Sequence, residues 1–81
     1  MTNLEKYNKV FKESFEVTDE QLKGNVEYQQ LELWDSVGHM GMIACLEEEF
    51  NIMFETDDII DFNSYEKGKE LLRKYDIIIE D

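Results

Sequence analysis

Apolar residues near the start of the chain recur three or four positions apart, which is the spacing of one face of an α-helix. They are Leu4, Tyr7, Phe11 and Phe15. Thr2 and Glu5 form a capping-box pair, in which each side chain accepts a hydrogen bond from the backbone N–H group of the other residue. The remaining side chains of this segment are mostly charged or polar. The pattern predicts an amphipathic first helix that ends near Phe15.

A second and longer helix is predicted after Trp34. Asp35 is a favoured N-cap residue, because its carboxylate can accept a hydrogen bond from a backbone N–H group two or three positions on. This cap makes Ser36 the first helical residue, and no proline interrupts the chain from there to Phe50. The apolar residues of this helix form two stripes when each residue is turned by about 100°. The stripe that we expect in the core contains Met42, Ile43, Leu46 and Phe50.

The other apolar stripe begins next to Ser36. It contains Val37, Met40 and Ala44 and lies beside Glu47 and Glu48. A surface helix needs one apolar stripe to pack on the core. The additional stripe therefore indicates either a docking surface for another protein or a face that packs under another helix, and the pattern alone does not distinguish the two.

Two shorter helices are predicted in the last third of the chain. Thr56 is followed by two acidic residues and resembles an N-cap, so a short helix is expected over residues 57–61. Asn63 and Glu66 form another capping-box-like pair, which predicts a last helix that ends near Tyr75. The β-branched tail that follows is expected to pack, in an extended form, against the first helix.

Residues 16–33, between the two long helices, lose the helical period. Thr18 can cap a short helical turn that ends near Gly24. A connection of this length is unusual in a compact domain unless it packs its own side chains, and this one contains several large apolar residues. We therefore expect an ordered loop. The whole pattern predicts an all-α fold in one domain over residues 1–81, a four-helix bundle with a long first loop and a short third helix.

Composition and charge narrow the range of partners. A chain of 81 residues forms one small domain, which buries only about 60% of its unfolded surface. Its formal net charge of -12 repels nucleic-acid phosphates and anionic membranes and favours basic protein surfaces. No apolar run approaches the roughly 20 residues that span a bilayer, and no signal-peptide pattern is present. We expect a cytoplasmic monomer with protein partners, without nucleic-acid binding or membrane insertion.

Candidate catalytic groups are few. His39 and Cys45 are the only histidine and cysteine of the chain. Six positions apart on one helix, they lie about 240° from each other around the axis, which excludes a Cys–His nucleophilic pair within that helix. We expect Cys45 to be a small core or boundary residue and His39 to be exposed. Hydrolysis by Ser36 and His39 is a weaker alternative, because the sequence offers no oxyanion hole or deep pocket.

The acidic residues after Glu55 do not match a calcium-binding loop. Such a loop needs oxygen ligands at alternating positions and a glycine at the sixth. Counting from Asp57 places Ile59 at the third position, and counting from Asp61 places Glu66 where the glycine belongs. The sequence therefore predicts no metal site, and an enzyme is the weakest of the functional hypotheses.

The remaining feature is a serine at the start of a helix. Unpaired N–H groups and the positive end of the helix dipole make such a start a favourable place for a phosphate ester. Ser36 is therefore a candidate for carrying a phosphorylated group, with an apolar stripe and acidic residues beside it. This combination, without a catalytic apparatus, indicates a carrier rather than a catalyst.

The same residues carry a resemblance to a known family. Asp35-Ser36-Val37, with Leu46-Glu47-Glu48-Glu49-Phe50 beginning ten residues after the serine, resembles the acyl carrier proteins and the related peptidyl carrier domains. The resemblance spans nearly the whole chain, although the family motif is Asp-Ser-Leu and Val37 departs from it. The segment from Trp34 to His39 is similar to a subgroup of free-standing carriers outside primary fatty-acid synthesis.

The resemblance implies that a separate phosphopantetheinyl transferase, which requires magnesium, attaches 4'-phosphopantetheine from coenzyme A to Ser36, beside Asp35. The thiol of this arm would hold an acyl or aminoacyl group as a thioester. An adenylate-forming acyl or aminoacyl ligase would load it and a downstream transferase or synthase would accept it, in a specialised biosynthetic or modification pathway. The docking surface for these enzymes would consist of Val37, Met40, Ala44, Glu47 and Glu48.

Gly38 and Gly41 stand where fatty-acid carriers commonly have acidic residues, so we expect partners other than the fatty-acid synthase enzymes. The alternative from another functional class is an acidic protein–protein interaction module with a carrier-like fold that is never modified. The two hypotheses differ at Ser36, which only the carrier requires.

Overall fold

The computed structural model describes residues 2–24 and 26–79 of the chain. Within these residues it contains five helices and no β-strand, so the all-α fold class is confirmed. The helices are α1 (Asn3–Phe15), α2 (Asp19–Lys23), α3 (Ser36–Phe50), α4 (Thr56–Asp61) and α5 (Tyr65–Arg73). The sequence pattern predicts four helices. The fifth is the turn capped by Thr18, which the structure extends into a helix of its own.

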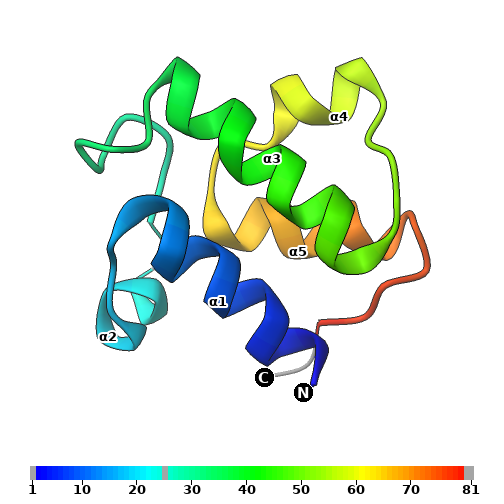
Figure 1. Cartoon of the computed structure of the whole chain (residues 1–81), viewed down its shortest axis with the longest axis horizontal. Helices are drawn as coiled ribbons and strands as arrows, with labels where there is room; N and C mark the ends of the chain where they lie inside the picture. The colour runs from blue at the N-terminus through cyan, green and yellow to red at the C-terminus, as the bar shows by residue number, and fades with distance from the viewer. Residues whose placement is uncertain (1, 25, 80–81) are drawn as a thin grey trace.

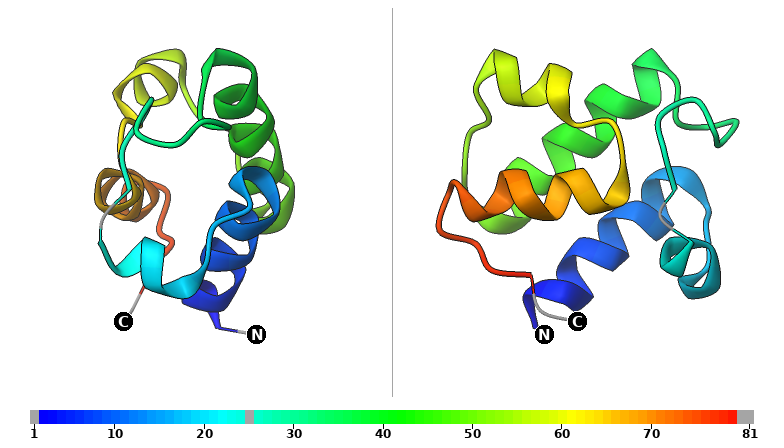
Figure 2. Two further views of the ribbon diagram at one scale, coloured as in Figure 1. Left: turned by 90° about the vertical axis from the view of Figure 1, so that its left-hand side faces the viewer. Right: turned by 180° about the vertical axis from the view of Figure 1, so that it is seen from behind.

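The helices surround one shared hydrophobic interior. α3 runs diagonally across the middle of the molecule, with α1 packed beside it (Figure 1). α4 lies above α3 at the top of the view (Figure 1). α1 and α5 lie on opposite sides of the interior, and α2 closes it from below (Figure 2). The fully buried large side chains are Trp34, Tyr7, Phe11, Phe62, Leu22, Met42, Ile43, Leu46 and Leu72. The predicted core stripe of the long helix is therefore confirmed at Met42, Ile43 and Leu46, with Phe50 partly buried against them.

The predicted N-caps of α1, α2 and α3 are confirmed, and those of α4 and α5 are shifted by one residue. The Thr2 and Glu5 capping box is present, with N–O distances of 3.1 and 3.0 Å. α4 includes Thr56, and its N-cap is Glu55, which makes no side-chain cap hydrogen bond. The N-cap of α5 is Ser64 rather than Asn63, and its hydroxyl accepts a hydrogen bond from Lys67 N at 3.0 Å.

Residues 26–35, which precede α3, form an ordered loop, as expected for this part of the connection. Its backbone is tied to the start of α5 on both sides of an isolated β-bridge between Glu27 and Ser64. Tyr28 N donates to Asn63 O at 2.8 Å, and Tyr65 N donates to Val26 O at 2.8 Å. These two bonds fix the position of the loop relative to the start of α5.

A buried carboxylate holds α4 to the turn that follows α5. Asp58 is only 3% exposed, and its two oxygens accept hydrogen bonds from Lys74 Nζ at 2.7 Å and Tyr75 Oη at 2.5 Å. These donors lower the pKa of Asp58, the lysine hydrogen bond first and the tyrosine second. Tyr75 Oη also accepts from Glu55 N at 3.0 Å, so the same turn stabilises the uncapped start of α4.

Residues 77–79 pack beside the first helix, as the sequence predicts. Ile77 is buried, and Asn3 Nδ2 donates to Ile78 O at 3.1 Å. Figure 1 shows this segment, in red, returning beside the first turn of α1.

Candidate functional site

Ser36 is the first residue of α3, and its side chain is exposed. Asp35 is the N-cap, and its Oδ1 accepts a hydrogen bond from Gly38 N at 2.8 Å. Both placements are as predicted from the sequence. The first turn of this 15-residue helix contains no acidic residue, so the cap residue Asp35 supplies the carboxylate that lies against the positive end of its dipole. The Ser36 hydroxyl lies at the same helix start, where backbone N–H groups favour a phosphate group.

The hydroxyl of Ser36 has a neighbour that the sequence pattern did not identify. Tyr28, from the loop before α3, places its Oη 3.2 Å from Ser36 Oγ. The two residues are eight positions apart across a segment without regular periodicity. No spacing rule connects them, and the contact follows from the backbone pairing of the loop with the start of α5.

His39 connects the loop, α3 and α4. Trp34 Nε1 donates to His39 Nδ1 at 2.9 Å. Because Nδ1 accepts this bond, the neutral ring carries its proton on Nε2, which donates to Ile59 O at 2.8 Å. The prediction that His39 is exposed is wrong, since the ring is half-buried. Its position four residues before Ile43, on the core face, is the signal that identifies it.

This arrangement bears on the hydrolase alternative. Both ring nitrogens of His39 are engaged by groups other than Ser36. A general base must lie within hydrogen-bond reach of the proton that it removes. His39 therefore serves as a structural bridge beneath the serine, and the geometry gives no support to a Ser36–His39 pair.

The backbone of the loop before α3 approaches Gly38 so closely that a larger residue would not fit there. A Cβ atom built on Gly38 would lie 2.0 Å from Leu33 O, well inside van der Waals contact. Gly41, one turn further along α3, has nothing within 4 Å of such a Cβ atom. The two glycines thus differ in their surroundings. Gly38 allows the helix start to pack under the loop, and Gly41 leaves an open surface.

The second apolar stripe of α3 is at the surface. Val37 is 82% exposed and Met40 is 53% exposed, and Ala44 is exposed as well. The alternative that this stripe packs under another helix of the chain is therefore wrong. Ile60 of α4 is also 72% exposed.

The two acidic residues beside this stripe differ in their surroundings. Glu48 is exposed, whereas Glu47 is half-buried and its Oε2 accepts a hydrogen bond from Phe54 N at 2.9 Å. Glu47 therefore holds the connection between α3 and α4 in place. Its carboxylate is less free to meet a partner than the carboxylate of Glu48.

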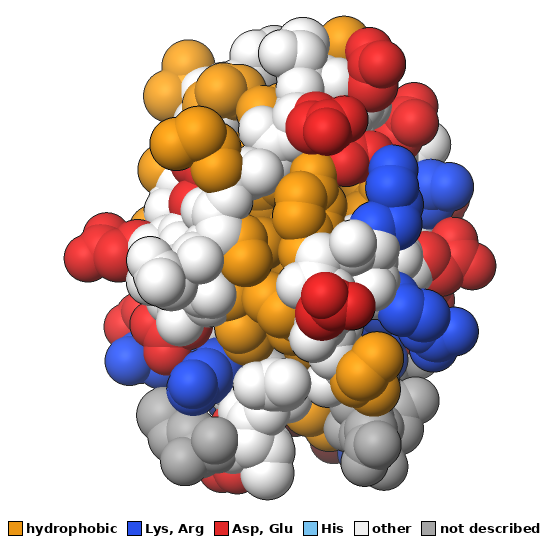
Figure 3. All heavy atoms as spheres, turned by 90° about the vertical axis from the view of Figure 1, so that its right-hand side faces the viewer, with side chains coloured by type: hydrophobic (Ala, Val, Ile, Leu, Met, Phe, Trp, Pro, Cys, Tyr) orange, Lys and Arg blue, Asp and Glu red, His pale blue; other side chains and the backbone are white. Residues whose placement is uncertain are grey.

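Hydrophobic side chains also reach the surface beyond this stripe. Figure 3 shows the face formed by the end of α3, the connection to α4 and the C-terminal segment, where a hydrophobic band runs between charged side chains. Met53, in that connection, is 81% exposed. Cys45 is exposed too, so its predicted core or boundary position is wrong. It lies about 100° around the helix from Leu46, enough to turn it away from the core.

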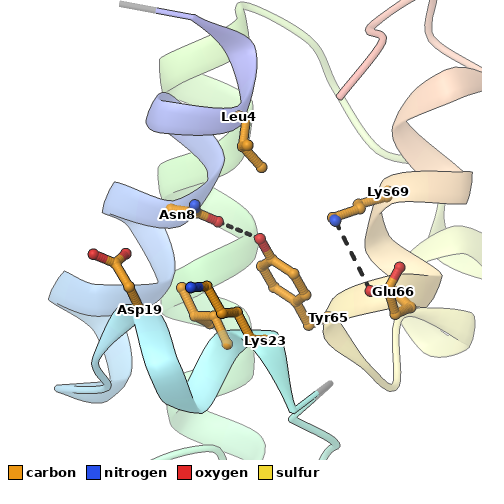
Figure 4. A pocket seen from close by; sticks show the side chains of 8 residues that line it. Leu4, Asn8, Asp19, Lys23, Tyr65, Glu66 and Lys69 are labelled. Carbon is orange, nitrogen blue, oxygen red and sulfur yellow. Dashed lines mark hydrogen bonds and ion pairs between the residues drawn. The ribbon is translucent and has the colours of Figure 1, made fainter. Parts of the chain in front are cut away.

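A pocket lies elsewhere on the molecule, between α1, α2 and α5. Its volume is about 560 Å³, and its lining side chains are Leu4, Asn8, Asp19, Leu22, Lys23, Tyr65, Glu66 and Lys69. Figure 4 shows Tyr65 in the middle, hydrogen-bonded to Asn8, with Lys69 and Glu66 paired on one side. The charges of its walls are mixed, and no residue of the Ser36 site lines it.

Two further findings concern metal-binding groups and membrane-spanning helices among the described residues. Within residues 2–24 and 26–79, no group of three or more His, Cys, Asp or Glu side chains is arranged to hold a metal ion. None of the helices in this part of the chain has the length and apolar character needed to cross a membrane.

Comparison with known proteins gives no relative. No protein-family model matches the chain, and no significant match is found among curated proteins or solved structures.

Proposed function

We propose that the chain is a carrier protein, of the acyl or peptidyl carrier type, whose Ser36 bears a 4'-phosphopantetheine arm. The observation that carries this proposal is the exposed Ser36 hydroxyl at the first position of α3, next to its cap Asp35 and an open apolar stripe. An all-α fold around one small core, with α3 as its longest helix, agrees with a carrier of this type.

The site residues suit the root of such an arm. Attachment joins Ser36 Oγ to the phosphorus that bears pantetheine in coenzyme A. The bond from this phosphorus to adenosine 3',5'-bisphosphate breaks, and the serine proton leaves to a base of the transferase. The resulting phosphodiester carries one negative charge at the start of α3, where backbone N–H groups and the helix dipole stabilise it. Once attached, the arm supplies a thiol that holds an acyl or aminoacyl group as a thioester.

The surface beside Ser36 suits docking of partner enzymes. Val37 and Met40 supply exposed apolar contacts, and Glu48 supplies an exposed charge at the far end of the stripe. With a net charge of -12, the chain favours partners with basic surfaces. We assign the partners to three classes, which are a phosphopantetheinyl transferase, an adenylate-forming ligase and a downstream transferase or synthase.

Loading with a defined cargo tests the carrier function. The folded chain is incubated with acetyl-coenzyme A, magnesium and a broad-specificity phosphopantetheinyl transferase, and its intact mass is followed. We expect a gain of one acetyl-phosphopantetheine, of which neutral hydroxylamine removes the acetyl group and leaves the arm. An unchanged mass in the folded wild-type chain would contradict the proposal.

The exposed apolar stripe also supports a second candidate, an interaction module that is never modified. Such a module keeps its affinity for a partner when Ser36 is replaced by alanine, because only one exposed oxygen atom is lost. A carrier retains its docking surface in this variant but can no longer be loaded.

A further inference from the structure

The hydroxyl group of Tyr28 is hydrogen-bonded to the hydroxyl group of Ser36, with 3.2 Å between their oxygen atoms. We infer that Tyr28 is a positioning residue of the modification site. Its hydroxyl holds the Ser36 hydroxyl before transfer and donates a hydrogen bond to the phosphodiester afterwards. This inference rests on the proposed function and adds a residue to its site.

The position of Tyr28 is set by the interior of the protein. Its backbone N–H donates to Asn63 O at 2.8 Å, which ties the residue to the start of α5. Its ring lies 5.5 Å from the His39 ring and 6.3 Å from the Trp34 ring, measured between centroids. The hydroxyl is therefore held over Ser36 by groups that are themselves hydrogen-bonded within the fold.

Those supporting rings are fixed in turn. Trp34 is fully buried and donates to His39, and His39 donates to Ile59 O. The ring of Tyr28 thus packs against Trp34 and His39, whose hydrogen bonds connect the loop, α3 and α4. A phenylalanine at this position keeps these ring contacts, so the role of the hydroxyl can be separated from that of the ring.

The hydrogen bond limits the freedom of the serine. An exposed serine side chain samples three staggered rotamers, and a partner on one side favours one of them. A nucleophile held in one orientation loses less entropy on reaching the transition state. The bond from Tyr28 therefore favours transfer without being part of the docking surface.

The direction of this hydrogen bond changes on modification. In the unmodified chain either hydroxyl can be the donor. After transfer the oxygen of Ser36 is an ester oxygen without a hydrogen atom, so in the bond that we infer Tyr28 is the donor, to the ester oxygen or to a charged phosphate oxygen. Hydrogen bonds to an ionised acceptor are the stronger kind, and this one adds to the field of the helix start.

The test compares transfer to wild type, Tyr28→Phe and Tyr75→Phe. Tyr75 lies in the turn after α5 and donates to Asp58, so its variant reports the effect of a lost hydroxyl and lowered stability away from Ser36. We expect Tyr28→Phe to lower the kcat for transfer about fivefold, as for the loss of one hydrogen bond, with an unchanged KM for the carrier chain. Tyr75→Phe should keep both constants.

An NMR measurement on the unmodified chain gives a readout that does not depend on transfer. The Hα–Hβ couplings of Ser36 should indicate one dominant rotamer in wild type and averaged rotamers in Tyr28→Phe. A purely structural role of Tyr28 would leave these couplings unchanged in the folded variant.

The outcomes separate this inference from the proposed function. Equal kcat values for wild type and Tyr28→Phe, or equal serine couplings, would overturn the role of Tyr28 and leave the carrier intact. A slower Tyr75→Phe would assign the effect to stability and also overturn it. An absence of transfer to the folded wild type would overturn both proposals.

Discussion

Each of the three serines of the chain lies in a different environment, and only one of these suits a covalent arm. Ser14 lies inside α1, where the backbone N–H groups are used by the helix. Ser64 lies at a helix start but is 8% exposed, and its hydroxyl already accepts the cap hydrogen bond from Lys67. Ser36 combines a helix start with an exposed hydroxyl, because Asp35 performs the capping in its place.

The two glycines of α3 provide a matched pair of variants. Gly38→Ala should lower the free energy of unfolding by about 2 kcal/mol, because the new Cβ meets the carbonyl of Leu33 and the loop must shift. Gly41→Ala should raise it by up to about 1 kcal/mol, since alanine favours a helix and the space is open. Urea unfolding, followed by the fluorescence of Trp34, measures both.

The test depends on the opposite signs of the two changes in unfolding free energy. Equal stabilisation by the two substitutions would mean that Leu33 does not approach the helix start as closely as described. The position of Tyr28 over Ser36 would then lose part of its support, because Tyr28 and Leu33 lie in the same loop.

Among the five helices of the described residues, α4 is the one whose N-cap makes no side-chain hydrogen bond. It has six residues and no side-chain cap, so its position depends on Asp58 and on the turn after α5. The neighbouring His39–Ile59 hydrogen bond ties the same helix to α3. The stability of α4 therefore rests on tertiary hydrogen bonds rather than on helix propensity.

Asp58→Asn tests this dependence through pH. At pH 7 the variant should be less stable by about 1 to 2 kcal/mol, because hydrogen bonds to a charged acceptor are replaced by neutral ones. The hydrogen bonds from Lys74 and Tyr75 hold the pKa of Asp58 below its ordinary value of about 3.9. Its stabilising contribution is thus present above that value and is lost as the pH falls through the lowered pKa.

The difference in unfolding free energy between wild type and Asp58→Asn should therefore shrink below about pH 4. Asp61→Asn, an exposed carboxylate of the same helix, is the control and should change stability by less than about 0.5 kcal/mol. A constant difference down to pH 2 would show that the Asp58 charge does not hold α4.

Sequence reasoning works best here for long elements with local signals. The starts of α1 and α3 and the core face of α3 follow from capping residues and from helical spacing, which act within a few positions. The N-cap of α5 is missed by one residue because Asn63 and Ser64 are both suitable caps. Only the structure shows that the Ser64 side chain, and not that of Asn63, reaches the third N–H group of the helix.

The remaining errors have both local and distant causes. The spacing of His39 from Ile43 places it on the core face, but only the structure shows that Trp34 and Ile59 are its partners. Tyr28 approaches Ser36 because a loop pairs with the start of α5, and no periodicity encodes that pairing. Cys45 is exposed although its neighbour Leu46 is buried, because consecutive residues point in directions about 100° apart around a helix. The residue type does not decide this, since a free cysteine can lie in the core or at the surface.

On the scale of the whole molecule, a small aromatic core supports a surface that is strongly acidic and partly apolar. The net charge of -12 makes copies of the chain repel one another, while exposed side chains such as Val37 and Met53 offer apolar contact to another protein. A carrier needs both properties, since it must remain dispersed and still bind several enzymes briefly. The interaction module that is never modified would need them as well, so they do not decide between the two.

Covalent modification decides between them, and intact mass measures it most directly. The wild-type chain, Ser36→Ala and Ser64→Ala are incubated with coenzyme A, magnesium and a broad-specificity phosphopantetheinyl transferase. The carrier account predicts a gain of one phosphopantetheine in wild type and in Ser64→Ala, and no gain in Ser36→Ala. A folded wild-type chain that gains no mass, or a gain that persists in Ser36→Ala, would contradict it.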